Sequence, residues 1–198
     1  MNFNPNTETE QKSKIDIEGG NPPSKDEEIS YEDMHPFLQE LIDEHHVYTK
    51  ELNAFEEAIA MIESGKIDKE VYEKLRQFFS YFDDQIVNYN QEGEKYLFAR
   101  ISKKMTEDEN FNVINFLETD HVKSIEMAAV AFNMLALFSR IPDEKSRFII
   151  LDIALNHAKE LLELLRVHIY REGTMILPYA QKNFTVEELT EIQQRSKS

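Results

Sequence analysis

Apolar residues recur every three or four positions over most of the chain. Between about Pro36 and Ser64 they form one stripe with His45 in its middle, and its apolar members are Leu38, Leu41, Tyr48, Leu52, Phe55 and Ile59. This spacing places all of them on one face of an α-helix. Only 5 Gly and 6 Pro interrupt the 198 residues, so the pattern predicts long helices.

The residues between the apolar stripes predict four long helices and a short final one. Gly65 ends the first helix, Asp68 is a good N-cap for the second, and Thr185 with Glu188 forms a capping box for the last. The predicted long helices cover about 36–64, 68–103, 108–139 and 143–182. Four long helices joined by short loops favour an all-α fold, an up-and-down antiparallel four-helix bundle with a short extra C-terminal helix across one end.

The first 30 residues differ in composition from the rest. They mix Gly, Pro, Ser and charged residues with few large apolar ones, so they cannot repay the entropy of ordering. We expect residues 1–30 to form a flexible tail and residues 31–198 to form the bundle domain. The start of the chain lacks the pattern of a signal peptide and no apolar run approaches a membrane span, so a cytoplasmic protein is expected.

Charge and cysteine content narrow the possible functions. The net charge is −16, from 38 acidic and 22 basic residues, which argues against a nucleic-acid or membrane partner because both need clustered Lys and Arg. The chain has no Cys, which excludes disulfides, thiolate chemistry and cysteine-held metal sites. Any metal must therefore be held by His, carboxylate or Tyr.

The six histidines include four that fall on apolar helix faces, namely His45, His121, His157 and His168. His168 and Glu172 lie one turn apart on the inner face of the fourth helix, and a buried carboxylate needs a cation, a proton or several hydrogen bonds. His121 on the third helix has apolar neighbours at spacings of three and four, namely Ile114, Leu117, Ile125 and Ala128. A single histidine on an apolar face is more often a hydrogen-bonded core residue than a ligand. The coincidence of three such helices, with His45 on the first, favours a metal site for iron, manganese or zinc.

The other histidines are poorer candidates for that site. We expect His35 and His46 to face solvent or to lie at a helix start. His157 shares the stripe of His168 but is 11 residues away, about 16 Å along the helix at roughly 1.5 Å per residue. Core packing is expected for His157.

Three segments resemble the hemerythrin-like, HHE cation-binding family. They are "LIDEHHVYTKELNAFEEAI", "LETDHVKS" and "LLRVHIYREGTMILPYAQKNFTVEEL", and the likeness spans about residues 36–190. The resemblance implies an up-and-down four-helix bundle around a non-haem di-iron centre that binds or senses dioxygen, handles NO or peroxide, or serves iron metabolism. Matched by position, it implies His45, His121, His168 and Glu172 as metal ligands.

The second helix departs from the family pattern, which has a His-x-x-x-Glu pair there. The segments "NYNQEGEKYLFA" and "HIYREGTMILPY" share a Glu-Gly pair, and aligning these pairs matches the family's pair to Asn88 and Glu92. Aligning the apolar positions instead gives Tyr89 and Gly93. A π-bulge near Gly93 would reconcile the two registers. The resemblance thus implies a site with one imidazole missing, its place taken by Asn88, Tyr89 or water, and we take Glu92 as the fifth metal ligand.

The sequence therefore predicts a non-haem iron protein with two iron ions, one ion or another divalent metal at this site. Its expected partner is a small diatomic molecule or peroxide. The alternative is a degenerate, metal-free bundle that acts as a protein-interaction module. No catalytic acid or base stands out beyond the ligands, so whether the protein is an enzyme stays open, as does its oligomeric state.

Overall fold

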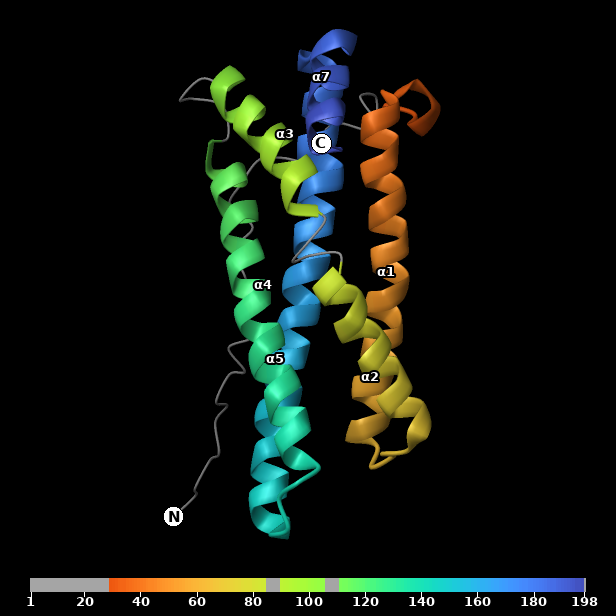
Figure 1. Cartoon of the computed structure of the whole chain (residues 1–198), viewed down its shortest axis with the longest axis vertical. Helices are drawn as coiled ribbons and strands as arrows, with labels where there is room; N and C mark the ends of the chain where they lie inside the picture. Colours follow the sequence, from red (N-terminus) through yellow and green to blue (C-terminus); the bar gives the residue numbers. More distant parts are fainter. Residues whose placement is uncertain (1–28, 85–89, 106–110, 198) are drawn as a thin grey trace, which may run out of the picture.

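The computed structural model describes residues 29–84, 90–105 and 111–197, and every regular element in these ranges is helical (Figure 1). The short helices are η2 (Tyr31–Asp33) and the π-helical turn η4 (Glu172–Ile176). The α-helices are α1 (Pro36–Glu63), α2 (Lys69–Phe82), α3 (Asn90–Lys104), α4 (Phe111–Phe138), α5 (Glu144–Arg171), α6 (Leu177–Asn183) and α7 (Val186–Ser196). The all-α class is confirmed. Most of the expected tail, residues 1–28, lies outside the described ranges.

The predicted ends of the helices are formed as the sequence chemistry requires. Gly65 follows α1 with a φ of 83°, a left-handed conformation that glycine adopts without steric cost. The Asp68 carboxylate accepts a hydrogen bond from the Val71 amide at the start of α2. Thr185 and Glu188 form both hydrogen bonds of the capping box that begins α7.

Two of the expected long helices are described in more than one segment. The second is described as α2 and α3, with residues 85–89 between them outside the described part. The fourth passes through η4 before continuing as α6. Pro178 follows this wide turn. It has no N–H for the Thr174 carbonyl and its ring crowds that carbonyl, which favours a wider turn at this point.

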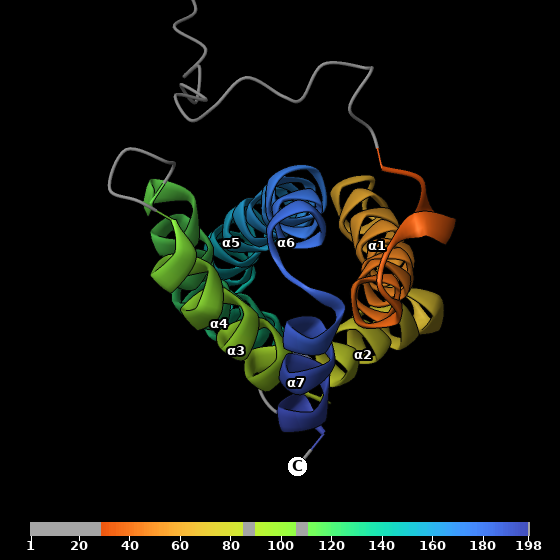
Figure 2. The same cartoon turned by 90° about the horizontal axis from the view of Figure 1, so that it is seen from above.

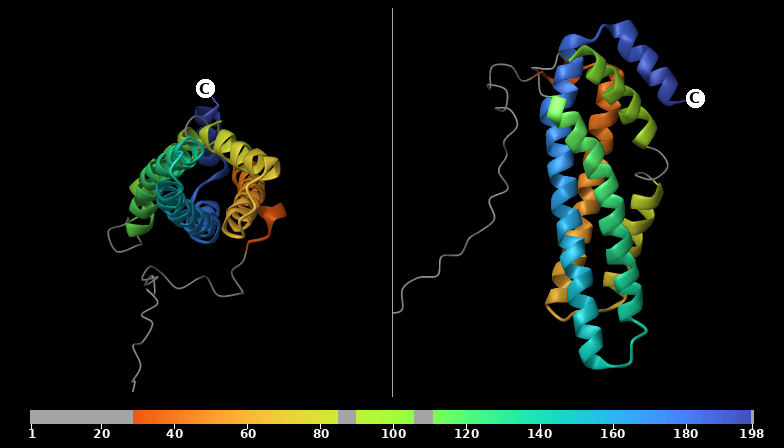
Figure 3. Two further views of the ribbon diagram at one scale, coloured as in Figure 1. Left: turned by 90° about the horizontal axis from the view of Figure 1, so that it is seen from below. Right: turned by 90° about the vertical axis from the view of Figure 1, so that its left-hand side faces the viewer.

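The helices run side by side, with α2 beside α1 and α5 beside α4 (Figures 1 and 2). At one end of the molecule α7 crosses over and packs against α3 and α1 (Figure 3). The final helix thus covers one end, as the sequence predicts.

Buried apolar side chains form two separate clusters along the length of the molecule. The first, which we call the α2 cluster, unites the C-terminal halves of α1 and α4 with α2 and α5, and Phe55, Phe78 and Leu161 are at its centre. The second, the α7 cluster, unites the N-terminal halves of α1 and α4 with α3, α6 and α7, and includes Leu38 and Leu97. Both α1 and α4 contribute to each cluster.

Phe55→Ala is expected to lower the free energy of unfolding by about 3–5 kcal/mol, because truncating a buried aromatic ring leaves a cavity. Phe55 is fully buried and stacks on Phe78 with ring centroids 3.9 Å apart. Chemical denaturation measures the change. Phe148→Ala is the matched control, since the Phe148 side chain is 62% exposed and its loss should change stability by no more than ~0.5 kcal/mol. Equal losses in the two variants would contradict the packing described.

Candidate metal centre

A layer of polar side chains lies between the α2 cluster and the α7 cluster. It contains His45 from α1, Glu94 from α3, His121 from α4, His168 from α5 and Glu172 from η4. These residues form two groups, one of Glu94, His121 and His168 and one of His45, Glu94 and Glu172. Within each group the potential ligand atoms all lie within 4.8 Å of one another, and Glu94 belongs to both.

The distances within the layer are short. His45 Nε2 lies 3.0 Å from Glu172 Oε2 and forms a hydrogen bond with it. His121 Nε2 lies 3.0 Å from Glu94 Oε2 and 3.2 Å from His168 Nε2. His168 Nε2 in turn lies 3.7 Å from Glu172 Oε2. Three imidazole nitrogens and two carboxylates therefore converge on one small region.

Several polar atoms of the layer are buried and lack a hydrogen bond. Glu172 is 0% exposed, and its Oε1 atom has no hydrogen-bond partner. Glu94 Oε2 likewise forms no hydrogen bond, although His121 Nε2 is within ion-pair distance. A buried carboxylate oxygen without a partner is costly, and a cation between the two carboxylates would remove that cost. The donor set of imidazole nitrogen and carboxylate oxygen fits such a cation.

A third carboxylate, that of Asp120, lies on the side of the His168 ring away from the layer. Asp120 is buried on α4, its Oδ2 lies 3.8 Å from His168 Nδ1, and the Arg171 guanidinium lies 3.2 Å from the same oxygen. The separation of 3.8 Å is too long for a hydrogen bond, and His168 Nδ1 has no hydrogen-bond partner. Arg171 keeps the negative charge of Asp120 compensated.

The charges of the layer stabilise one another in the metal-free protein. Burial alone would lower the pKa of His45, but the hydrogen bond and charge of Glu172, with the charges of Glu94 and Glu44, raise it above its ordinary value. Burial alone would likewise lower the pKa of His121, but the nearby Glu94 raises it above its ordinary value. Burial would raise the pKa of Glu172, yet the neighbouring histidines, His45 first, hold it below its ordinary value. In the metal-free protein, His45 and His121 each lie beside a carboxylate that favours the protonated form of the imidazole.

The structure brings together four of the five residues that the sequence predicts as ligands: His45, His121, His168 and Glu172. The side chain of the fifth, Glu92, lies outside the described residues, as do Asn88 and Tyr89. Gly93, near which a π-bulge would reconcile the two registers, is α-helical. In the described part of the chain the π-helical residues are Asp83 and Asp84, just before the undescribed segment, and those of η4.

Sequence reasoning missed Glu94. A signal for it was present, because Glu94 precedes Leu97, Phe98 and Ile101 by three, four and seven positions. This spacing extends the buried stripe of α3 back to the carboxylate. The shared Glu-Gly pair directed attention to Glu92 instead, two positions earlier.

The remaining histidines lie away from the layer. The His46 side chain is 72% exposed. His35 lies at the start of α1, as expected, but it is buried there, where Nδ1 accepts a hydrogen bond from the Phe37 amide and Nε2 contacts Thr190 Oγ1. His157 is half-buried beside Glu160. Next to His121, Ser124 is buried and Ile125 is exposed, so the expectation that Ile125 faces the core was wrong by one position.

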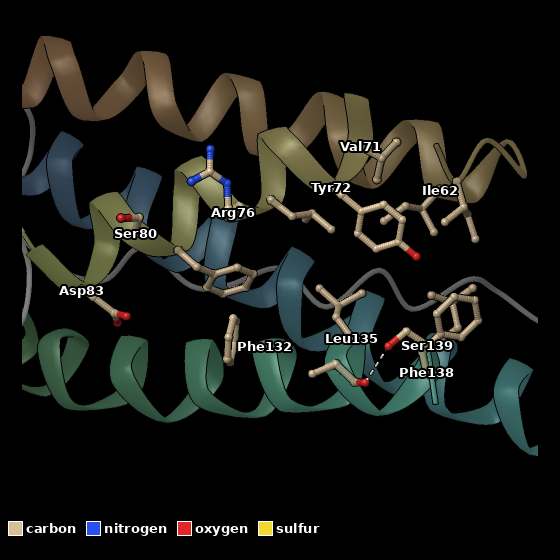
Figure 4. Close-up of a pocket in the computed structure, with 15 residues that line it drawn as sticks. Ile62, Val71, Tyr72, Arg76, Ser80, Asp83, Phe132, Leu135, Phe138 and Ser139 are labelled. Carbon is tan, nitrogen blue, oxygen red and sulfur yellow. Dashed lines mark hydrogen bonds between the residues drawn. The ribbon is translucent and has the colours of Figure 1, made fainter. Parts of the chain in front are cut away.

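A separate cavity of about 410 Å³ lies between α2 and α4 (Figure 4). Its walls are mainly apolar and include Val71, Leu75, Phe79, Phe132 and Leu135. None of the five residues of the polar layer lines it. We therefore place the candidate metal chemistry in the layer and not in this cavity.

One described helix is long and apolar enough to cross a membrane, although the sequence analysis expects no such segment. It is the stretch Val113–Phe138 of α4, and 22% of its most apolar 18-residue window is buried. The same stretch contributes His121 to the polar layer and the buried Asp120 beside it. Core helices of soluble proteins have the same length and composition, so these two properties do not indicate a membrane span.

The metal-free protein is expected to lose stability as the pH rises above about 6.5, because the pKa values of His45 and His121 are raised in the folded state. A histidine whose pKa is raised in the folded state stabilises fully below the unfolded pKa of about 6.5, and this contribution disappears as the pH passes the folded value. Urea denaturation of the metal-free protein at several pH values measures the effect. His45→Gln should flatten the dependence, whereas His46→Gln should not. Stability that rises over this range would contradict the ionisation state described.

No family model matches the chain, and no match is found among curated proteins or solved structures. The function is therefore argued from the chemistry of the polar layer.

Proposed function

We propose that the chain is a non-haem iron-binding protein of the hemerythrin-like, HHE cation-binding kind. In this proposal the helices form an up-and-down antiparallel four-helix bundle, with α2 and α3 together as its second member and α7 as the extra C-terminal helix. The protein binds or senses dioxygen, NO or peroxide, or serves iron handling, in the cytoplasm. The observation that carries the proposal is the convergence of three imidazoles and two carboxylates in the buried layer.

The spacing of the side chains supports two metal ions. Ligand atoms about 2.1 Å from one ion and at right angles to each other are roughly 3 Å apart, close to the 3.0 and 3.2 Å separations in the layer. His121 and His168 would hold one ion, His45 and Glu172 the other, and Glu94 would bridge them because it belongs to both groups. Three protein ligands for each ion leave coordination positions open.

Iron bound there would supply a centre that coordinates small molecules and changes its oxidation state. The protein residues would tune and protect that centre. The two apolar clusters on either side would limit the access of water and protons, and Asp120 lies close enough to His168 Nδ1, at 3.8 Å, to act on the ring by its charge. Neutral imidazoles are needed as ligands, so metal uptake would release the protons that His45 and His121 carry in the metal-free protein.

His168→Ala is expected to remove most of the bound metal and to lower the thermal midpoint, because metal binding is coupled to the stability of the fold. Elemental analysis of the purified protein and the optical spectrum of its oxidised form test the site and identify the metal. His46→Ala is the control, since that side chain is exposed and distant from the layer. Wild-type protein reconstituted with ferrous iron that retains none would refute the proposal.

Glu94→Ala is expected to abolish binding of both ions, because this carboxylate is shared between the two ligand groups. His45→Ala should by contrast remove about one ion per chain and leave the other. Metal-to-protein ratios after iron reconstitution distinguish the outcomes. Glu92→Ala is the matched comparison on the same helix, and a loss of metal in that variant with none in Glu94→Ala would assign the ligand to Glu92.

One observation favours a second candidate, the protein-interaction module. Large apolar side chains are exposed on α4 and α5, among them Val122, Phe148 and Ile149. Exposed apolar side chains of this size are typical of surfaces that contact other proteins when they form a continuous patch. Wild-type protein that binds no iron would leave this role as the better supported one.

A further inference from the structure

Tyr48 carries a buried hydroxyl group that no other group in the structure satisfies. The residue is 6% exposed, and its hydroxyl oxygen has no hydrogen-bond partner. Buried tyrosine hydroxyls ordinarily find a partner, because leaving one unpaired costs free energy. Among the described residues this is the one buried side-chain hydroxyl without a hydrogen bond.

Its position ties the hydroxyl to the polar layer. Tyr48 follows His45 by three residues on α1, which places both side chains on the same face of the helix. The phenol belongs to the α2 cluster and therefore approaches the layer from that side. The charge of Glu94, across the layer on α3, acts on the phenol without a hydrogen bond between them. Tyr48 is thus the member of the α2 cluster that is nearest to His45 along α1.

The phenol is suited to donate and not to accept a proton. Burial, with smaller contributions from Tyr81 and Glu94, raises the pKa of Tyr48 well above its ordinary value. The group is therefore a neutral O–H donor at physiological pH. No carboxylate or imidazole of the polar layer accepts a hydrogen bond from the Tyr48 hydroxyl.

We infer that the Tyr48 hydroxyl is the hydrogen-bond donor to the small-molecule ligand of the metal centre. The inference rests on the proposed function and adds a residue that selects the ligand. A donor at this point favours ligands with a lone pair on the atom remote from the metal, such as peroxide, azide or NO. In this inference Tyr48 does not bind the metal; it contacts the bound small molecule and positions it.

The experiment compares Tyr48→Phe with the wild type in both the metal-free and the iron-loaded states. Tyr81→Phe is the matched control, because the Tyr81 ring packs against Tyr48 with centroids 5.6 Å apart while its own side chain is only half-buried. Azide is the probe for the ferric protein. Its affinity is measured by optical titration, and its stretching frequency is compared in H2O and D2O.

We expect Tyr48→Phe to keep the full metal content and to bind azide about tenfold more weakly, the loss of roughly one hydrogen bond. The solvent-isotope shift of the azide stretch should disappear in this variant and persist in Tyr81→Phe. In the metal-free protein Tyr48→Phe should not lower the denaturation midpoint, because no hydrogen bond is lost there.

Two results would overturn the inference while leaving the proposed function intact. One is unchanged azide affinity and isotope shift in an iron-loaded Tyr48→Phe protein. The other is a clear loss of stability of this variant without metal, which would mean that the hydroxyl has a structural partner. Wild-type protein that takes up no iron would instead overturn the proposed function, and this inference with it.

Discussion

The compensation of charge inside the polar layer is the constraint on which the rest of the structure depends. Glu172 and Glu94 are buried among apolar side chains, and each carboxylate is tolerated only because an imidazole lies within about one hydrogen-bond length. The imidazoles come from α1 and α4 and the carboxylates from α3 and η4, so four stretches of chain must meet at one level. The helix packing on either side is fixed by that requirement as much as by apolar burial.

On the proposed function, metal binding and proton binding would compete in this layer. Glu172 and Glu94 favour the protonated forms of His45 and His121, and a bound dication would take over that role and displace the protons. Removing one member leaves a buried charge uncompensated, which costs more than the pair contributes. His–Glu pairing would therefore be the state from which the proposed centre takes up a metal.

Much of the fold and part of the site could be predicted from the sequence. The stripe through His45, the caps at Asp68 and Thr185, and the inward turn of His168 and Glu172 follow from spacing along single helices. The spacing of Glu94 to Leu97, Phe98 and Ile101 also indicates an inward position, but the repeated Glu-Gly motif pointed to Glu92 instead. The π-helical turn within the fourth helix does not follow from spacing along a single helix. Tyr48 could be predicted as buried, but its lack of a partner is visible only in three dimensions.

The division of the core into two apolar clusters has a mechanical consequence. In the described chain α2 belongs to one cluster, α3, α6 and α7 to the other, and α1 and α4 span both. Each end of the molecule thus has an apolar core of its own, and continuous helices and the polar layer join the two cores. A group bound in the polar layer would contact helices of both cores and would couple local unfolding at one end of the molecule to local unfolding at the other. Binding at the proposed centre would therefore change the stiffness of the whole molecule.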